Sequence, residues 1–390
     1  MPKVLHISFS PSGGAGIVAG NLSKAIEAHT SWQSELITFH PSNLWLNPSA
    51  DILATATSAI DEFLVKKTNV STAFSLFRTS QNFSKAHLAQ IQNADIVHLH
   101  WVEGLLHGEF LGALMEKRPG SVFYTLHDMR PFTGGCHFAG HCEGFRTSCT
   151  DCPIVRSVFK GHVAGNFVTR SNILKELSPV FVAPGEWMRE RFLESTFRDL
   201  SCYTIPYALS ASAFAISDKA TRQGSLKLGF IAAKLNDQRK GLVMARKQVR
   251  ELVHAGLDLT LQLVGSDPPS ELESWEHYVG FLGDAEIREW LIGLDFLVFT
   301  SLNDNAPLVV SEALAAGTPI LIAQGTGADH MVSLGVDSLD LFSATIGDLK
   351  QEQTERRLSK GARNTAKEFS PIQAAQRIVL LYEEKSISIH

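Results

Sequence analysis

The sequence has no excess of basic residues and no long hydrophobic run. Its 390 residues include 35 Lys and Arg against 40 Asp and Glu, a net charge of −5, which argues against the strongly basic face of a nucleic-acid-binding protein. No apolar stretch reaches the roughly 18–20 residues needed to span a bilayer. The N-terminal stretch MPKVLHISFSPSGG has the pattern of a strand and a glycine-rich turn rather than of a signal peptide. We therefore expect a cytoplasmic protein with no nucleic-acid partner.

Cysteine is scarce and unevenly distributed. Four of the five cysteines fall in one short stretch: Cys136, Cys142, Cys149 and Cys152. Cytoplasmic thiols stay reduced, and the final Cys-x2-Cys spacing is one that structural zinc sites use. The pattern leaves three alternatives open: a zinc clip in which His137 or His141 could replace one thiol, disulfides, or free buried thiols. Protein would fill every position of such a zinc site, so the metal would be structural and not catalytic.

The chain alternates strand-like and helix-like segments, and 390 residues are too many for one ordinary core. Strands are expected at 3–9, 34–40, 95–101, 121–127, 179–184, 227–233, 259–265, 294–301 and 318–324. Helices are expected at 17–28, 103–117, 240–256, 309–316 and 370–385. This alternation predicts two α/β units with parallel sheets, joined by the polar stretch 210–225.

A glycine-rich turn follows the first strand. The stretch GAGIVA (14–19) fits a dinucleotide-binding fingerprint, but the second strand ends in Phe39-His40-Pro41 and lacks the acidic residue that would hold a ribose. A nicotinamide cofactor is therefore disfavoured. The turn still presents free N–H groups at a helix start. The residues that we expect to bind phosphate or acceptor there are Gly13, Gly14, Ala15 and Gly16, the alternative being a tight turn that needs positive φ angles.

The stretch TSLNDNAPLVVSEALAAGTPILIA (300–323) is the richest in functional signals. A strand ends at Thr300, and amides from Asn305 to Val309 lie at a helix start, where a diphosphate is stabilised by free N–H groups and the helix dipole. Glu312, eight residues after Asp304, could accept hydrogen bonds from vicinal hydroxyls of a ribose or hexose. The alternative is that Glu312 caps the helix or pairs with a surface lysine.

Two lysines follow a strand further upstream, in AAKLNDQRKG (232–241). Lys240 is expected at a helix start, where a cation is disfavoured unless an anionic ligand is shared. Lys234 and Lys240 could together neutralise a diphosphate without a metal ion. The alternative is two solvated surface lysines.

The segment 63–85 carries Phe and basic residues without any acidic residue. Such a segment could lie on an anionic membrane, which would place the protein on the inner face of the plasma membrane. The alternative is a helical excursion packed on the core.

Three stretches resemble the C-terminal half of GT-B-fold retaining glycosyltransferases of family 4: KLGFIAAKLNDQRKGLVMA, LVG and YVGFLGDAEIREWLIGLDFLVFTSLNDNAPLVVSEALAAGTPI. Two more resemble the N-terminal half, SPSGGAGIVAGNLSKAI and TLHDMRPFTGGCHFAGHCEGFRTSCTDCP, and the second is similar to a branch that builds bacterial exopolysaccharides of the colanic-acid type. The resemblance implies an α/β fold with two Rossmann-like domains that face each other across a cleft. The acceptor-binding domain would be 1–205, the nucleotide-sugar-binding domain 206–369, and a helix in 370–390 would pack back on the first domain.

The resemblance also implies roles for individual residues. In such enzymes an E-x7-E motif holds the donor sugar and the nucleotide ribose; Asp304, one methylene shorter than the usual Glu, and Glu312 match it. An Arg and Lys pair on the diphosphate corresponds to Lys234 and Lys240, so that a point charge replaces a bidentate fork at Lys234. Residues that match the loop around the donor phosphate and sugar are Asn305, Ala306, Pro307 and Leu308.

Further matches lie at the nucleobase and in the N-terminal domain. Phe281 and Leu282 match the segment that meets the base through backbone atoms. His127 matches a histidine near the transferred sugar, and Asp128 follows it as in the exopolysaccharide branch. Tyr207 departs from the family pattern, which has Asn there. We take as catalytic candidates His127, Lys240, Asp304 and Glu312.

The implied activity is retaining transfer of a hexose from a nucleotide-diphosphate sugar, most often UDP-glucose or a related UDP-sugar, to an oligosaccharide or lipid-linked saccharide. Catalysis would require no cofactor. Three other functions compete with it: a sugar-nucleotide epimerase of the same fold, a zinc-organised binding protein without catalysis, and a nicotinamide oxidoreductase.

Overall fold

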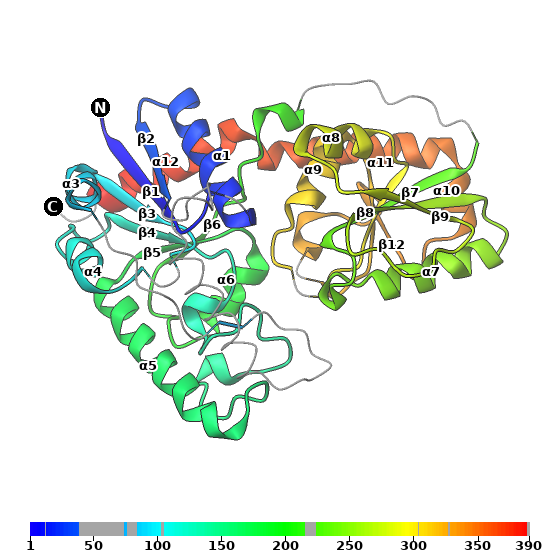
Figure 1. The fold of residues 1–390 in the computed structure, drawn as a ribbon. Coiled ribbons are helices and arrows are strands. Elements are labelled where there is room, and N and C mark those ends of the chain that lie inside the picture. Colours follow the sequence, from blue (N-terminus) through cyan, green and yellow to red (C-terminus); the bar gives the residue numbers. More distant parts are fainter. Residues whose placement is uncertain are drawn as a thin grey trace. The chain divides into compact units, whose positions relative to one another are not determined.

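The structure, a computed structural model, describes residues 1–11, 13–38, 74–75, 84–102, 105–214, 224–302, 304–326 and 328–387. The chain divides into two compact units (Figure 1). Unit 1 comprises Met1–Ala208 and Pro371–His390, and unit 2 comprises Leu209–Ser370. The chain thus leaves unit 1 once and returns to it for its last helix.

Unit 1 is built on a six-stranded sheet with the order β2-β1-β3-β4-β5-β6. The strands are β1 (Lys3–Ser8), β2 (Gln33–Thr38), β3 (Ile96–Leu99), β4 (Val122–Thr125), β5 (Val180–Ala183) and β6 (Cys202–Thr204). All neighbours pair in parallel. Parallel sheets are covered on both faces, which explains why the inner strands β3, β4 and β5 are buried throughout and mostly apolar, whereas the edge strand β2 is mostly polar.

Helices cover both faces of this sheet. They are α1 (Gly13–His29), α3 (Lys85–Asn93), α4 (Gly108–Met115), α5 (Lys160–Leu177), α6 (Glu186–Leu193) and α12 (Pro371–Ile387). Residues of α4, α5 and α6 pack on one face, where Leu5 and Val97 are buried. Residues of α1 and α12 pack on the other face, where Val4 and Phe123 meet Tyr382 of α12. The last helix therefore lies beside the first one in unit 1 (Figure 1).

Unit 2 has a second six-stranded sheet with the order β12-β11-β10-β7-β8-β9, also parallel. Its strands are β7 (Leu226–Lys234), β8 (Leu259–Ser266), β9 (Glu276–Gly280), β10 (Phe296–Phe299), β11 (Ile320–Ile322) and β12 (Ser338–Asp340). Its helices are α7 (Leu242–His254), α8 (Asp284–Ile292), α9 (Leu308–Ala316), α10 (Ile346–Lys350) and α11 (Glu352–Thr365). One apolar core includes Leu228, Phe296 and Leu321.

Each strand expected from the sequence overlaps an observed strand, and the expected α/β fold with two parallel sheets is confirmed. Three helix starts were wrong. The expected helix 17–28 begins earlier, at Gly13, the expected helix 103–117 is α4, which begins only at Gly108, and the expected helix 240–256 begins at Leu242. Lys240 instead ends a 3-10 turn, because Gly241 adopts the left-handed conformation with φ 76° between the turn and α7.

The basic, Phe-rich segment 63–85 lies mostly outside the described residues. Of its described residues, Phe74 packs partly buried against the core of unit 1, and Lys85 begins α3. No helix within the described ranges is both long enough and apolar enough to cross a membrane. The expected membrane contact of this segment stays a prediction.

Candidate functional site

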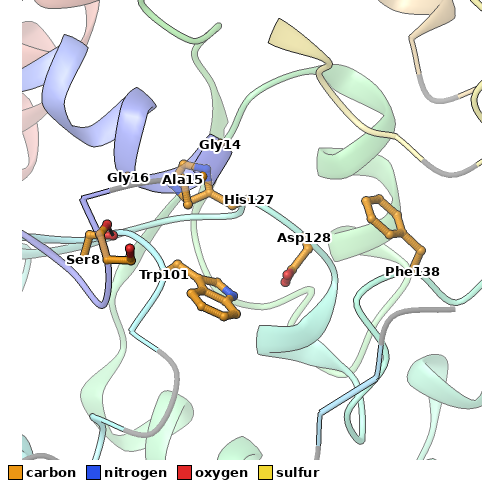
Figure 2. A pocket seen from close by; sticks show the side chains of 10 residues that line it. Ser8, Gly14, Ala15, Gly16, Trp101, His127, Asp128 and Phe138 are labelled. Carbon is orange, nitrogen blue, oxygen red and sulfur yellow. Dashed lines mark hydrogen bonds between the residues drawn. The ribbon is translucent and has the colours of Figure 1, made fainter. Parts of the chain in front are cut away.

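A pocket of about 290 Å³ lies in unit 1 at the carboxyl edge of the sheet (Figure 2). Its lining residues are Ser8, Ser10, Gly13, Gly14, Ala15, Gly16, Trp101, His127, Asp128 and Phe138. The carboxyl ends of parallel strands meet at one edge, where open α/β sheets bind ligands. The structure thus brings together all six residues that the sequence assigned to this unit's substrate site.

Close backbone packing explains the glycine-rich turn at this pocket. A Cβ atom on Gly16 would lie 2.3 Å from the carbonyl oxygen of Ser10, so a larger residue would displace the turn. Gly13 has a φ of 76°, a conformation that glycine adopts without strain. Helix α1 begins at Gly13, and its first N–H groups have no partner within the helix. The turn at residues 13–16 can therefore be a tight turn that requires glycine and can also bind a ligand through its N–H groups.

His127 belongs to a line of hydrogen-bonded side chains that runs from the pocket into the core, which we call the histidine string: His6, His100, His127 and Tyr207. The Nδ1 atom of His6 lies 2.9 Å from Nε2 of His100, and Nδ1 of His100 lies 3.0 Å from Nε2 of His127. The hydroxyl of Tyr207 lies 2.9 Å from Nδ1 of His127, and the two rings stack. Both ring nitrogens of His127 are therefore engaged.

A fourth histidine, His98, packs against the histidine string. Its ring stacks on His100 with centroids 4.6 Å apart. Its nitrogens bond the hydroxyl of Tyr382, at 2.5 Å, and that of Thr125, at 2.8 Å. Helix α12, which carries Tyr382, thereby contributes to the support of the pocket.

These histidines are uncharged at neutral pH. Burial lowers the pKa of His6 to about 3, and burial lowers the pKa of His127 to about 4 although the charge of Asp128 opposes it. The pKa values of His98 and His100 are also held well below 6.5, first by burial and then by neighbouring histidines. An imidazolium in this core would lack the water that stabilises its charge.

Asp128, His137 and Ser75 form an arrangement that resembles a hydrolase triad. Nδ1 of His137 lies 2.8 Å from Oδ2 of Asp128, and Nε2 of His137 lies 2.8 Å from Oγ of Ser75. However, Ser75 is only 2% exposed, and Nε of Arg130 donates to its Oγ at 2.9 Å. A nucleophile must be able to reach a substrate. The arrangement therefore anchors Ser75 and holds Asp128 in place.

The four clustered cysteines are free thiols, with Cys149 and Cys152 buried and Cys136 and Cys142 half-buried. Backbone N–H groups donate to the sulfur atoms of Cys142, Cys149 and Cys152. No three of these sulfur atoms lie within 4.8 Å of one another. Among the described residues, only ligand atoms of His6, His98 and His100 form a group of three that is this close. The thiols form a cluster that is looser than a closed metal site.

His137 is not a replacement ligand for this cluster, contrary to one alternative from the sequence. Its two nitrogens are taken by Asp128 and Ser75. His141 is exposed. The cysteines themselves remain the candidate ligands.

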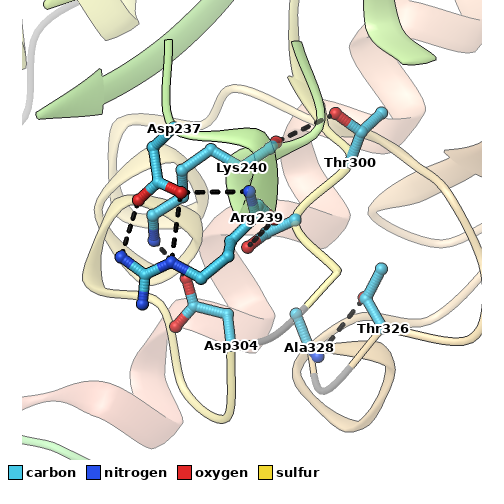
Figure 3. A network of polar contacts seen from close by, with 8 residues as sticks. Asp237, Arg239, Lys240, Thr300, Asp304, Thr326 and Ala328 are labelled. Atoms are coloured by element: carbon cyan, nitrogen blue, oxygen red, sulfur yellow. Dashed lines mark hydrogen bonds and ion pairs between the residues drawn. The ribbon is translucent and has the colours of Figure 1, made fainter. Parts of the chain in front are cut away.

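In unit 2, a turn after β7 and a loop after β10 meet (Figure 3). Asp237 caps the turn Gln238–Lys240, and both of its carboxylate oxygens accept hydrogen bonds from the Arg239 side chain. The Thr300 hydroxyl donates to the carbonyl oxygen of Gly241 at 2.9 Å. A Cβ atom on Gly241 would lie 2.1 Å from the Thr300 carbonyl oxygen. A glycine is therefore required where the turn meets the end of β10.

Two predicted site residues form an ion pair at this junction. Nζ of Lys240 lies 2.8 Å from Oδ2 of Asp304, and their side chains are 34% and 16% exposed. An ammonium group carries three donors, so Lys240 can hold Asp304 and still meet an anion. The structure thus joins the lysine predicted to bind the diphosphate to the first acid of the predicted sugar motif.

The start of α9 lies directly after this ion pair. Asn305 and Ala306 are buried, Pro307 is the N-cap residue, and Leu308 is the first helical residue. On the next turn, burial and then the charge of Asp284 together raise the pKa of Glu312 to about 6. A carboxylate that is half withdrawn from water and that forms no ion pair with the described residues is well suited to accept hydrogen bonds from a ligand.

Lys234, Phe281 and Leu282 lie at the same edge of the sheet. Lys234 ends β7, exposed, opposite Ser266, and Phe281 and Leu282 follow β9. Phe281 is 74% exposed. Among the described contacts, no hydrogen bond or ion pair joins these three residues to the Lys240–Asp304 pair.

Sequence reasoning missed several residues of both sites. In unit 1 it missed Ser8, Ser10, Trp101, Phe138, Tyr207 and the buried histidines His6, His98 and His100, and in unit 2 it missed Asp237 and Asp284. A signal was present for the histidines, because His6 and Ser8 of β1, and His98 of β3 with His100 directly after it, alternate with apolar residues. Such residues share one face of the sheet.

Comparisons with known proteins agree with this architecture. Residues 226–352 match a family model described as "Glycosyl transferases group 1". The chain is 26% identical over 253 residues to WcaC of Escherichia coli (strain K12), whose name assigns it to colanic acid biosynthesis as a glycosyl transferase. This match covers 61% of the chain and spans only 60% of that relative's length.

Solved structures extend the likeness to almost the entire chain. Anabaena Alr3699/HepE, crystallised in complex with UDP and glucose, has a TM-score of 0.62 at 16% identity over 98% of this chain and 100% of that one. A sucrose-phosphate synthase from Thermosynechococcus elongatus has a TM-score of 0.65 at 14% identity over 98% and 99%. The chain therefore has the GT-B fold, and its residues 226–352 are similar to the glycosyl transferases group 1 model.

Proposed function

We propose that this protein is a retaining glycosyltransferase that moves a hexose from a UDP-sugar to a saccharide in bacterial exopolysaccharide biosynthesis. Unit 2 binds the nucleotide sugar and unit 1 binds the acceptor. The likeness to WcaC supports the exopolysaccharide role. The solved structures of HepE with UDP and with UDP-glucose support UDP as the nucleotide.

One observation carries this proposal: the Lys240–Asp304 ion pair lies directly before the N-terminus of α9, in the segment that matches the glycosyl transferases group 1 model. The lysine and the free N–H groups of the first helical turn favour the same ligand, a diphosphate. Asp304 supplies an acceptor for a sugar hydroxyl beside that diphosphate. Glu312, one turn later, accepts from the ribose hydroxyls.

The chemistry that these groups support is charge stabilisation. Cleavage of the bond between C1 of the sugar and the diphosphate oxygen leaves an oxocarbenium-like centre and a doubly charged leaving group. Lys240, Lys234 and the helix N-terminus stabilise the leaving group by preorganised electrostatics. The acceptor oxygen then bonds to C1 on the same face, and its proton goes to an oxygen of the departing diphosphate.

Unit 1 supplies the pocket for the acceptor, with His127, Asp128 and the turn 13–16 in its wall. The acceptor in this proposal is a growing oligosaccharide, carried on a lipid at the cytoplasmic face of the membrane. His127 positions a sugar and is not an obligatory base, since burial lowers its pKa to about 4 and makes it a weak proton acceptor.

We also propose that the cysteine cluster holds a structural zinc ion and that catalysis needs no cofactor. Backbone N–H groups aimed at three of the sulfurs stabilise thiolates. The contact with the Cys136 thiol, followed by two backbone N–H groups, lowers the pKa of Cys152 to about 6. Thiolates are the form that binds zinc.

Elemental analysis tests the zinc. We expect one equivalent per chain, lost in Cys152→Ser and kept in Cys202→Ser, because Cys202 is a buried thiol of β6 outside the cluster. Fully active protein without zinc would rule it out.

A thermal-shift panel with UDP, GDP and NAD tests the proposed function. A ligand at one hundred times its Kd stabilises the folded state by about 2.7 kcal/mol, so UDP should raise the melting temperature while GDP and NAD do not. UDP-sugars should then release UDP only when an acceptor saccharide is added. A sugar that changes configuration without an acceptor would indicate an epimerase. No shift with any nucleotide would refute the donor site.

A further inference from the structure

The histidine string ends in an unpaired nitrogen. Nε2 of His6 is buried and has no hydrogen-bond partner in the described part of the chain. Every other ring nitrogen of the string is bonded, at 2.9 or 3.0 Å. A neutral imidazole has one N–H donor and one acceptor nitrogen. The protons of the string can therefore be arranged in only two ways that keep all of its hydrogen bonds.

The two arrangements differ at the ends of the string. In the first, each ring is protonated at Nε2, Tyr207 donates to His127, and Nε2 of His6 carries a buried N–H without an acceptor. In the second, each ring is protonated at Nδ1, so that Nδ1 of His127 donates to Tyr207 and only a lone pair of His6 is unpaired. Buried N–H groups without an acceptor are rarer in proteins than incompletely used acceptors. The second arrangement is therefore favoured.

We propose that His6 and His100 are positioning residues that hold His127 as a neutral imidazole protonated at Nδ1. His127 then donates a hydrogen bond to a sugar oxygen that takes the place of the Tyr207 hydroxyl, and it does not accept a proton from the acceptor. This inference rests on the proposed function, in which the pocket holds a saccharide. It names the ligand atom that the ring recognises: an oxygen lone pair.

The surroundings of the string resist a charge on His127. Protonation of Nε2 would turn the His100 N–H away from it and would reverse the string as far as His6. Burial lowers the pKa of His127 to about 4, and Asp128 is the charged group that opposes this effect. The hydroxyls of Thr125 and Tyr382 bond His98, which stacks on His100, and carry no charge that would stabilise an imidazolium.

The hydrogen bonds of these histidines disfavour a metal ion in the cluster. Ligand atoms of His6, His98 and His100 lie within 4.8 Å of one another. However, His98 and His100 use both ring nitrogens in hydrogen bonds, so a bound metal would break at least two of them. The arrangement is already satisfied without an ion except at Nε2 of His6.

Nuclear magnetic resonance of the full chain labelled with ¹⁵N-histidine tests the proton positions directly. Long-range ¹H–¹⁵N correlations distinguish Nδ1–H, Nε2–H and imidazolium forms, and single His→Asn variants assign the signals. At pH 7 we expect His6, His100 and His127 all to be neutral and protonated at Nδ1. An Nε2–H form or an imidazolium at His127 would overturn the proposal.

Two variants of His100 test whether the string acts on His127. His100→Asn keeps an N–H near the position of Nδ1, whereas His100→Leu removes it. We expect the Asn variant to keep His127 protonated at Nδ1, and the Leu variant to show mixed forms and about tenfold slower transfer, the effect of one lost hydrogen bond. The melting-point shift with UDP, which binds unit 2, should be unchanged in both. Identical His127 spectra in the two variants would show that His100 does not control the proton position of His127.

The outcomes separate this inference from the proposed function. If either variant fails to fold, the spectrum of the wild-type protein still decides the proton positions. A protein that has the predicted spectrum but transfers no sugar would refute the function alone. An active protein with His127 protonated at Nε2 would refute the inference alone.

Discussion

Unit 1 and unit 2 both place polar groups at the carboxyl edge of a six-stranded parallel sheet, but the groups differ in charge and exposure. The pocket of unit 1 is backed by buried, uncharged histidines that bond one another. The site of unit 2 has a half-buried ion pair and a half-buried carboxylate. Neutral donors and acceptors suit the hydroxyl groups of a saccharide, whereas cations and helix N-termini suit a diphosphate.

The contrast makes the two units respond differently to acid, and this is the largest effect that we expect. The pKa values of His6 and His127 are about 3 and about 4, below the ordinary 6.5. Below pH 6.5 the unfolded chain therefore binds more protons than unit 1 does, so the stability of unit 1 is complete above pH 6.5 and falls as the pH drops towards 4. Each such histidine lowers the free energy of unfolding of unit 1 by up to about 1.4 kcal/mol for each unit that the pH falls in this range.

Hydrogen exchange resolved by peptide, corrected for its intrinsic pH dependence, measures this loss. Peptides of β1 and β3 should lose several kcal/mol of protection between pH 7 and pH 5, an order-of-magnitude sum over the buried histidines. Equal losses in both units would show that the histidines are not the cause.

Removal of the cation from unit 2 should have the next largest effect. Lys240→Ala takes away the charge that we propose beside the leaving group and leaves Asp304 without this ion-pair partner. We expect kcat to fall by about 10²–10³-fold, as for the loss of one preorganised donor. Lys247→Ala is the matched control, because Lys247 lies exposed on α7. Similar activity in the two variants would contradict a role for Lys240 at the diphosphate.

Glu312→Gln should separate stability from binding. The pKa of Glu312, raised to about 6 from 4.5, means that the folded protein binds more protons between these values. The charged carboxylate therefore costs stability above pH 6, and this cost disappears below about pH 4.5. We expect the variant to be up to about 2 kcal/mol more stable at pH 8 and to bind UDP about 10²-fold more weakly, for two lost hydrogen bonds to a charged group. Calorimetry measures the UDP affinity and thermal unfolding measures the stability. An unchanged UDP affinity would exclude a contact between Glu312 and the ribose.

The smallest effect is expected at Phe281. Its side chain is 74% exposed, and the family resemblance assigns its nucleobase contact to the backbone. Phe281→Ala should therefore change the Kd of UDP by less than about threefold, since aromatic stacking on a base contributes 1–3 kcal/mol where it occurs. A loss of tenfold or more in calorimetry would show that the ring stacks on the base.

The sequence predicted the sheets better than the connections between them. Apolar strands such as 3–9 and 294–301 are recognisable because burial on both faces requires a continuous apolar run. The three-residue strands β6 and β12 and the polar strand β9 carry no such pattern. Their places are set by neighbouring strands and not by their own residues.

The candidate sites divide in a similar way. The turn 13–16 and the loop 304–308 are local in sequence, so their residues could be named from spacing alone. The partners of His127 could not, since Tyr207 is 80 residues away and reaches the ring only through the fold. His98 depends on Tyr382, which is 284 residues further along the chain.

The position of α12 has a consequence for biosynthesis. Residues 371–387 belong to unit 1 but follow all of unit 2 in the chain. On the ribosome, unit 2 can therefore fold before unit 1 receives its last helix. Until then His98 lacks the hydroxyl of Tyr382, and an apolar face of the first sheet stays uncovered. Premature termination near residue 370 would release a chain with a complete unit 2 and an unfinished, aggregation-prone unit 1.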